Sequence, residues 1–301
     1  KLGQIEGNDY IAVVHIDGNK TGERFKECKN LEEIRNLSKS IKTATENAFK
    51  SMVKELINII ENKNIISEDN GFILIKINDG VILPLRPIVI GGDDVTFICH
   101  GKLGVWLAET FIKEFVKHKV GDKPLSACGG VSIVKTKYPF YRAYLMAEDL
   151  TNNAKKRSRY KCNGDSSFLD FFISSSGWSG TIEDTLENYF KIIPGNLHFG
   201  PYRIDPSSDE ESIENIKNIT KKFHTFPRNK VLKLRELLFE DAKYSQAIAA
   251  ELKVRLKDEL PPIKGRNYHI NLWEDREGES GKRTPYFDAI ELLDFYPEGL
   301  L

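Results

Sequence analysis

The sequence predicts an α+β fold in which helices cover an antiparallel sheet. Short apolar runs typical of buried strands alternate with longer stretches whose apolar residues recur every three or four positions, as along one side of a helix. A Gly-Gly-Asp-Asp run at residues 91–94 separates two apolar runs and is short enough to be a tight hairpin turn. Beyond residue 180 the patterns are mainly helical. We therefore expect a sheet domain over residues 1–176 and a mainly helical C-terminal subdomain over 177–301.

The elements of the sheet domain are expected to begin with a buried strand over residues 10–16 and a long helix whose apolar stripe spans 37–60. The loop, strand, hairpin, helix, strand, helix and strand that follow are expected at residues 62–71, 72–77, 87–99, 103–115, 126–135, 143–154 and 168–173. Gly129-Gly130 lies inside a strand and indicates a place where another backbone approaches closely. We expect the helices to pack on one face of the sheet. In the second half, helical patterns cover residues 182–192, 211–222 and 229–260.

The composition limits the classes of protein to which the chain could belong. The 301 residues include 44 Lys and Arg and 44 Asp and Glu, so no overall charge attracts the chain to a duplex or a membrane; other nucleic-acid contacts stay open. The four cysteines form no C-x-x-C pair, which favours reduced thiols in a cytoplasm over a zinc ribbon or a disulfide framework. The chain has no apolar stretch of ~18 residues and no signal-peptide pattern, so we expect no membrane partner.

The turn at Gly91-Gly92-Asp93-Asp94 is the first candidate site. Glycines can take positive φ and let a backbone or a phosphate come close. The turn presents two adjacent carboxylates, which repel each other unless a cation joins them. Mg²⁺ prefers one or two carboxylates plus substrate phosphates, so a divalent metal is a suitable partner. For the motif alone, a solvated surface turn is the alternative.

A third carboxylate, Asp17, ends the first buried strand and is followed by Gly18-Asn19. A carboxylate at the end of a central strand, beside a hairpin that carries two more, is the geometry that two-metal nucleotidyl transfer needs. One metal lowers the pKa of the attacking hydroxyl, and both neutralise charge on the phosphate.

Together these stretches resemble the palm domain shared by GGDEF cyclases, class III adenylate cyclases and the large subunit of type III CRISPR complexes (the Cas ten family). The GGDD turn matches that large subunit letter for letter, and Asp17-x-Asn19-x-x-Gly22-x-x-Phe25 is similar to its first motif. Asn19 stands where many relatives carry a second Asp. The resemblance extends from residue 9 to about 173 and implies a ferredoxin-like palm sheet.

A third motif, Ala147–Lys155, resembles the stretch that ends the palm in GGDEF and related cyclases. The resemblance implies that Lys155 lies near the triphosphate. The basic residues that follow, from Lys156 onward, are better explained as a solvated helix end, where the helix dipole favours cations.

The resemblance implies a metal-dependent nucleotidyltransferase that joins nucleoside triphosphates by 3′-hydroxyl attack on an α-phosphate. The product would be a cyclic nucleotide or a cyclic oligoadenylate-like second messenger in antiphage defence. Asp17 and Asp93 would hold Mg²⁺ or Mn²⁺ with help from Asp94 and from the backbone carbonyl of Gly18. The nucleotide would meet Gly18, Asn19, Gly91, Gly92 and Lys155. ATP is the substrate that the resemblance favours, and related palms often meet face to face, as a homodimer or with a partner palm.

A palm that binds nucleotide without turnover, as a sensor or scaffold, is the alternative function. The presence of all three carboxylates favours the enzyme, because a binding module needs no metal pair. Asn19 and the neutral net charge keep the alternative open. His15 is expected to point to the face of the strand opposite Asp17 and to be a packed core histidine.

Overall fold

The structure is a computed structural model, in which the chain divides into two compact units. The first comprises Lys1–Trp178 with Arg203–Asp205 and Leu300, and the second comprises Ser179–Tyr202 with Pro206–Gly299 and Leu301. The described residues are 9–62, 72, 76–77, 80–121, 123–174, 184, 190–192, 195–240, 247, 250–251, 259–276, 278 and 281–301. Most of the loop and strand expected at 62–77 lies outside them, as does most of the helical pattern at 182–192. The helix expected over 229–260 ends at Leu237, and most of that pattern beyond residue 240 also lies outside the described residues.

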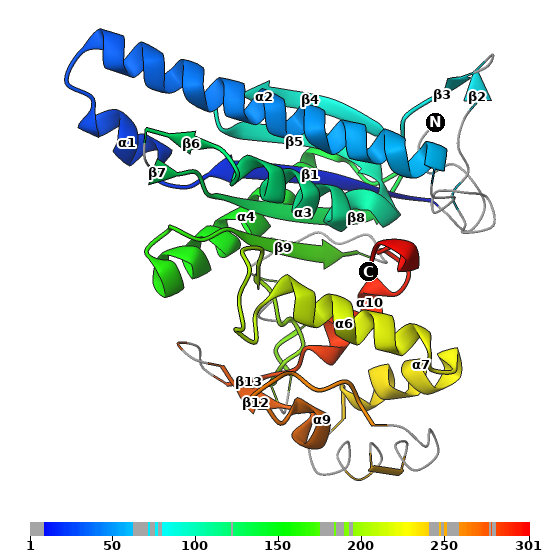
Figure 1. The fold of residues 1–301 in the computed structure, drawn as a ribbon. Coiled ribbons are helices and arrows are strands. Elements are labelled where there is room, and N and C mark those ends of the chain that lie inside the picture. Colours follow the sequence, from blue (N-terminus) through cyan, green and yellow to red (C-terminus); the bar gives the residue numbers. More distant parts are fainter. Residues whose placement is uncertain are drawn as a thin grey trace. The chain divides into compact units, whose positions relative to one another are not determined.

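The first unit is built on a six-stranded sheet with the order β11-β9-β8-β1-β5-β4 (Figure 1). Its strands are β1 (Tyr10–Gly18), β4 (Leu85–Gly91), β5 (Asp94–His100), β8 (Ala127–Lys135), β9 (Phe168–Ile173) and β11 (Tyr202–Arg203), of which only Arg203 belongs to the first unit. The pairs from β8 to β4 are antiparallel, and β9 runs parallel to β8. This sheet, flanked by helices, confirms the predicted α+β palm.

The first unit also contains shorter elements. They are α1 (Thr21–Glu27), η2 (Gly101–Leu103) and two short hairpins, β2 (Lys76–Ile77) with β3 (Gly80–Val81) and β6 (Lys119–Val120) with β7 (Lys123–Pro124).

Three long helices cover the sheet: α2 (Leu31–Asn62), α3 (Gly104–Phe115) and α4 (Phe140–Cys162). The apolar stripe predicted for α2 is buried up to Leu56, and the Phe49 ring of the helix packs edge-on against Phe97 of β5 with ring centroids 6.2 Å apart. Burial of such a stripe, more than helix propensity, stabilises a helix in a folded protein. The long helix predicted from spacing is therefore confirmed, and it begins six residues before the stripe does.

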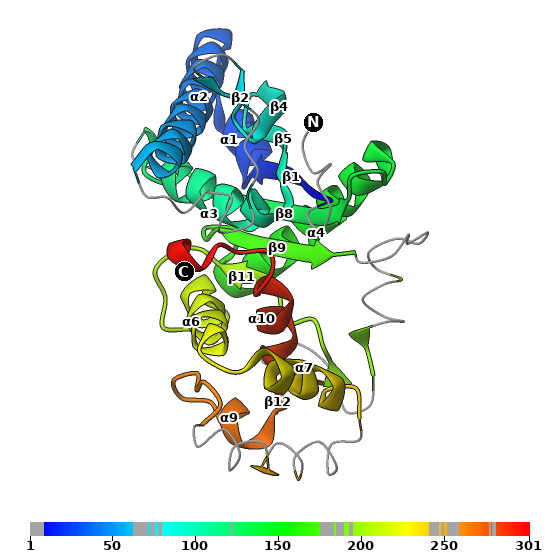
Figure 2. The same ribbon diagram turned by 90° about the vertical axis from the view of Figure 1, so that its right-hand side faces the viewer.

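The helices lie on both faces of the sheet, so the expectation that they share one face is wrong. Successive residues of a strand point to opposite faces. A Cβ built at Gly129 would lie 3.3 Å from Ile112 of α3, whereas one at Gly130 would lie 2.1 Å from the carbonyl oxygen of Ala147 of α4. Figure 2 shows the same arrangement, with α2 and α3 on one side of the sheet and α4 on the other.

The second unit contains α6 (Ile213–His224), α7 (Arg228–Leu237), α9 (Tyr268–Asn271), α10 (Tyr286–Leu292) and η4 (Glu298–Leu300). A small sheet of β10 (Gly195–Asn196), β13 (Lys282–Arg283) and β12 (Glu274–Asp275) accompanies them. Strands of two residues have no measurable periodicity, which is why the sequence did not predict them. Across the described parts of both units, no helix is both long enough and apolar enough to span a bilayer.

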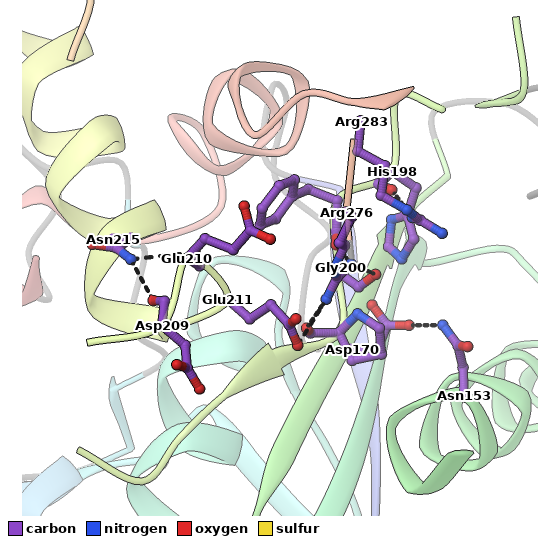
Figure 3. A network of polar contacts seen from close by, with 12 residues as sticks. Asn153, Asp170, His198, Gly200, Asp209, Glu210, Glu211, Asn215, Arg276 and Arg283 are labelled. Carbon is purple, nitrogen blue, oxygen red and sulfur yellow. Dashed lines mark hydrogen bonds and ion pairs between the residues drawn. The ribbon is translucent and has the colours of Figure 1, made fainter. Parts of the chain in front are cut away.

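A buried arginine organises the second unit (Figure 3). Arg276 is fully buried and pairs with Glu211 at 3.0 Å. Its guanidinium also donates to the carbonyls of Phe199, Gly200 and Pro201. A buried charge is tolerated when it is paired and hydrogen-bonded, and the Glu211 carboxylate and the three carbonyls supply these partners to the two terminal nitrogens. They attach the 199–201 loop to the segment that precedes α6.

We expect Gly130→Ala to lower the free energy of unfolding by about 3 kcal/mol, because the new methyl group would overlap the backbone of α4. Urea denaturation measures the change. Gly22→Ala is the matched control: this glycine is exposed in α1, and a Cβ there meets nothing within 4 Å. The control should be neutral or slightly stabilising, since alanine favours a helix. Equal losses in the two variants would contradict the close approach of α4 to β8.

Candidate active site

The register of β1 against β5 places Asp17 directly opposite Asp94. Asp17 is the last residue but one of β1, and Asp94 is the first residue of β5, so both carboxylates lie at the same end of the sheet. The structure thus brings together residues that are 77 positions apart in the sequence. It does so through backbone pairing, which fixes their spacing whatever their charge.

The turn between β4 and β5 is a two-residue connection, in which Gly91 pairs with Asp94 and Gly92-Asp93 forms the tip. Gly92 has φ of 62°, which only glycine adopts without strain at the first position of such a turn. The Thr45 hydroxyl of α2 donates to the Gly92 carbonyl at 2.6 Å and holds the tip. Gly91 and Gly92 are exposed, and open space lies where a Cβ would be. Their backbone is therefore accessible.

Gly18 and Asp93 are in direct contact. The Gly18 amide donates to the Asp93 carbonyl at 3.2 Å. A Cβ at residue 18 would lie 2.6 Å from Oδ2 of Asp93, so only glycine leaves room for that carboxylate. Asp17, Gly18, Asp93 and Asp94 thus form one group, referred to below as the acidic end.

Lys155 of α4 donates from Nζ to Oδ2 of Asp17 at 2.5 Å. Its side chain is 15% exposed, and that of Asp17 is 37% exposed. Thr151, one turn earlier in α4, donates to the carbonyl of His15 at 3.0 Å and fixes the helix against β1. Lys155 therefore belongs to the acidic end, whereas Lys156 is exposed on another side of the helix.

Asn19 is buried, and its side chain is not directed at the carboxylates. Its amide nitrogen donates to the Ser166 carbonyl at 3.1 Å, and its backbone amide donates to Ser126 at 2.8 Å. These bonds secure the loop that follows β1. Asn19 thus supports the position of Asp17 and Gly18 through the backbone.

His15 lies on the same face of β1 as Asp17, so the expectation that it points to the opposite face is wrong. The two residues are separated by two positions, and strand side chains repeat with a period of two. Nδ1 of His15 lies 3.1 Å from the Thr96 hydroxyl and 3.4 Å from Oδ1 of Asp94. The period of two, applied correctly, is the signal that could have placed this residue in the site.

The environment of the acidic end changes the pKa of Asp94. Burial raises the pKa of Asp94, and the negative charges of Asp17 and Asp93 raise it as well, while His15 and Lys155 lower it. Oδ1 of Asp94 is buried and accepts no hydrogen bond from the described residues. Such an environment makes a negative charge on Asp94 costly until a cation approaches.

A family model described as Cas10/Cmr2, second palm domain, matches residues 10–162, which is just over half of the chain. The chain belongs to this family. The resemblance to the large subunit of type III CRISPR complexes, seen in the sequence, is thereby confirmed. A comparison with curated protein sequences finds no match.

One solved structure with a TM-score of 0.50 supports the fold, and two further structures are similar at lower scores. Csm1 from T. onnurineus is similar at 15% identity with a TM-score of 0.50, over 95% of this chain and 37% of that one. A Csm1–Csm4 cassette in complex with one ATP is similar at 16% identity and a TM-score of 0.48, over 95% and 36% of the two chains. The GGEEF domain of a diguanylate cyclase from Vibrio cholerae is similar at 12% identity with a TM-score of 0.35, over 56% of this chain and 85% of that one. This Cas10/Cmr2 chain thus spans about a third of the length of the Csm1 chains.

The donor set of the acidic end fits a divalent cation that arrives with a substrate. Within the described ranges, no group of three or more His, Cys, Asp and Glu side chains is arranged to hold a metal ion alone. Mg²⁺, however, is commonly held by one or two carboxylates together with substrate phosphates. Asp17 and Asp94 provide such a pair, and the carboxylate of Asp93 lies against Gly18 next to them.

We expect Lys155→Ala to destabilise the metal-free protein by about 1 kcal/mol, because Asp17 would lose its partner while it still faces Asp94. Urea denaturation in the presence of a chelator measures the loss. Lys156→Ala, on the exposed side of the same helix, should change stability by less than about 0.5 kcal/mol. Similar losses in the two variants would indicate a diffuse basic helix end instead of a specific pair.

Proposed function

We propose that this palm is a metal-dependent nucleotidyltransferase that converts nucleoside triphosphates into a cyclic nucleotide or cyclic oligonucleotide second messenger in antiphage defence. The observation that carries the proposal is the placement of Asp17 opposite Asp94 beside an exposed Gly-Asp turn. The family relationship supports it, and ATP as the substrate rests on that relationship alone. In this proposal residues 1–176 are the palm and 177–301 a separate subdomain, and a second palm would face the first.

Each residue of the acidic end has a role in the proposed reaction. Asp17, Asp93 and Asp94 would hold Mg²⁺ or Mn²⁺, together with the carbonyl of Gly18. The bound metal would lower the pKa of the attacking 3′-hydroxyl and offset negative charge on the α-phosphate. Gly91 and Gly92 leave the backbone open to phosphate oxygens.

Lys155 would exchange one anionic partner for another. In the free protein its ammonium neutralises Asp17. With Asp17 engaged in holding a metal, the ammonium would be available to a triphosphate bound at the same place, which is the role that the family resemblance gives it. An ammonium suits this exchange, because it is a point charge on a flexible stem.

A palm that binds nucleotide without turnover is the second candidate. Two observations favour it: Asn19 adds no charge where many relatives have a carboxylate, and its side chain is bonded to Ser166. Lys155 already neutralises Asp17, so the acidic end is stable enough without metal to serve as a binding site.

Replacing both Asp93 and Asp94 by Ala should abolish product formation, because the carboxylates that hold the metal would be lost. Mass spectrometry of products after incubation with all four triphosphates and Mg²⁺ or Mn²⁺ measures this, and circular dichroism checks the fold. Glu27→Ala, which removes an exposed carboxylate paired with Lys123, is the control and should leave product formation unchanged. Near wild-type product from the double variant would show that the metal assignment is wrong.

Thermal unfolding with nucleotide separates the enzyme from the binding module. If metal and nucleotide bind together at Asp17, Mg²⁺ should increase the stabilisation by nucleotide, which reaches about 2.7 kcal/mol at a hundred times the Kd. Asp17→Asn should reduce the increase. Lys155→Met, the control, also breaks the pair with Asp17 but keeps the carboxylate, so it should retain the metal dependence. A nucleotide shift that ignores both metal and Asp17 would support the binding module.

A further inference from the structure

His15 is enclosed by the elements that build the acidic end. It is buried on β1, and its ring packs edge-on against Tyr144 of α4 with centroids 5.5 Å apart. On the other side lies β5, with the Thr96 hydroxyl 3.1 Å and Oδ1 of Asp94 3.4 Å from Nδ1. One ring nitrogen therefore lies close to two oxygen atoms of different chemistry.

The two oxygens differ in the hydrogen bonds that they can form with that nitrogen. An ionised carboxylate only accepts hydrogen bonds, whereas a hydroxyl can donate or accept. Apart from the contact with Nδ1 of His15 at 3.4 Å, the buried Oδ1 of Asp94 meets no hydrogen-bond donor among the described residues. If Nδ1 carried a lone pair, it could accept from Thr96, and Oδ1 would face a second lone pair. If Nδ1 carries the proton, it can donate toward Oδ1 while Thr96 acts as an acceptor.

We propose that His15 is a positioning residue for Asp94: its Nδ1–H holds Oδ1 and so orients the carboxylate toward a divalent cation at the acidic end. The metal part of this proposal rests on the proposed function. Outer partners of this kind fix the orientation of a ligand, and their loss typically weakens metal binding by about 10–100-fold.

The same geometry distinguishes His15 from His100, the other buried histidine of this sheet. His100 lies at the far end of β5, and its Nδ1 accepts a hydrogen bond from the backbone amide of Lys102 at 3.2 Å. Nδ1 of His100 is therefore without a proton. The two rings should carry opposite assignments at Nδ1, and His100 serves as an internal reference.

Long-range ¹⁵N–¹H NMR of the metal-free wild-type protein tests the hydrogen bond, with both rings assigned through the backbone. The expected result is a protonated Nδ1 at His15, in the neutral ring or the imidazolium, and an unprotonated Nδ1 at His100. An unprotonated Nδ1 at His15 would overturn the proposal. This measurement needs no variant and no activity.

Mn²⁺ binding in the presence of a non-hydrolysable nucleoside triphosphate, followed by electron paramagnetic resonance, tests the role toward the metal. His15→Phe should weaken binding by about 10–100-fold. His15→Asn, whose amide nitrogen can occupy the place of Nδ1, should restore binding to within a few-fold of wild type. His100→Gln, which removes the buried histidine outside the site, should bind as wild type does.

Three results would each overturn the positioning role. Mn²⁺ binding could be weakened equally in His15→Phe and His15→Asn, it could be unchanged in His15→Phe, or the wild-type protein could bind no Mn²⁺. Product formation is assayed separately. A wild-type protein that binds Mn²⁺ through this arrangement but makes no product would contradict the nucleotidyltransferase and leave the role of His15 standing.

Discussion

The antiparallel register of β1 with β5 is the constraint on which the rest of the site depends. It holds Asp17 and Asp94 opposite each other through main-chain hydrogen bonds, which do not respond to the charge of the side chains. A slip of one residue would move every side chain of β1 to the other face. The apolar residues that alternate with His15 and Asp17, Val14 and Ile16, are fully buried and make such a slip unfavourable. The core therefore determines the position of two carboxylates that would otherwise repel each other.

The repulsion is balanced by groups that come from three different elements. Lys155 approaches Asp17 from α4, His15 approaches Asp94 from within β1, and Thr45 of α2 holds the turn from the opposite side of the sheet. This balance leaves the pKa of Asp94 raised, chiefly through burial. The site is thus acidic but incompletely neutralised, which is the state in which a divalent cation gains most by binding.

Much of this could be predicted from the sequence, because short motifs and apolar spacing are local signals. The palm sheet, the long helix and the close approach at Gly130 were of this kind. The distribution of helices over two faces could not be read in the same way, since it depends on which neighbour each strand face meets. The partner of Lys155 could not be predicted either, because a separation of 138 positions in the sequence sets no distance between it and Asp17.

The errors within the site have different causes. His15 was placed on the wrong face by miscounting a two-residue repeat, and Thr45 and Thr96 lie on elements whose packing only the tertiary structure defines. Asn19 occupies a position of the first motif, yet its side chain hydrogen-bonds to the Ser166 carbonyl and does not contact the carboxylates. A motif thus predicts which residues gather more reliably than it predicts the partner of each atom.

The hydrogen bond from Thr45 to the Gly92 carbonyl has a mechanical consequence. Thr45 lies near the middle of α2, whose 32 residues extend over about 48 Å. A helix resists stretching along its axis, so a small displacement at either end of α2 is passed along it to the carbonyl at the hairpin tip. The glycine tip has open space where a Cβ would lie, so side-chain packing does not oppose its movement there. The spacing of Asp93 relative to Asp17 therefore depends on whatever touches α2 along its whole length.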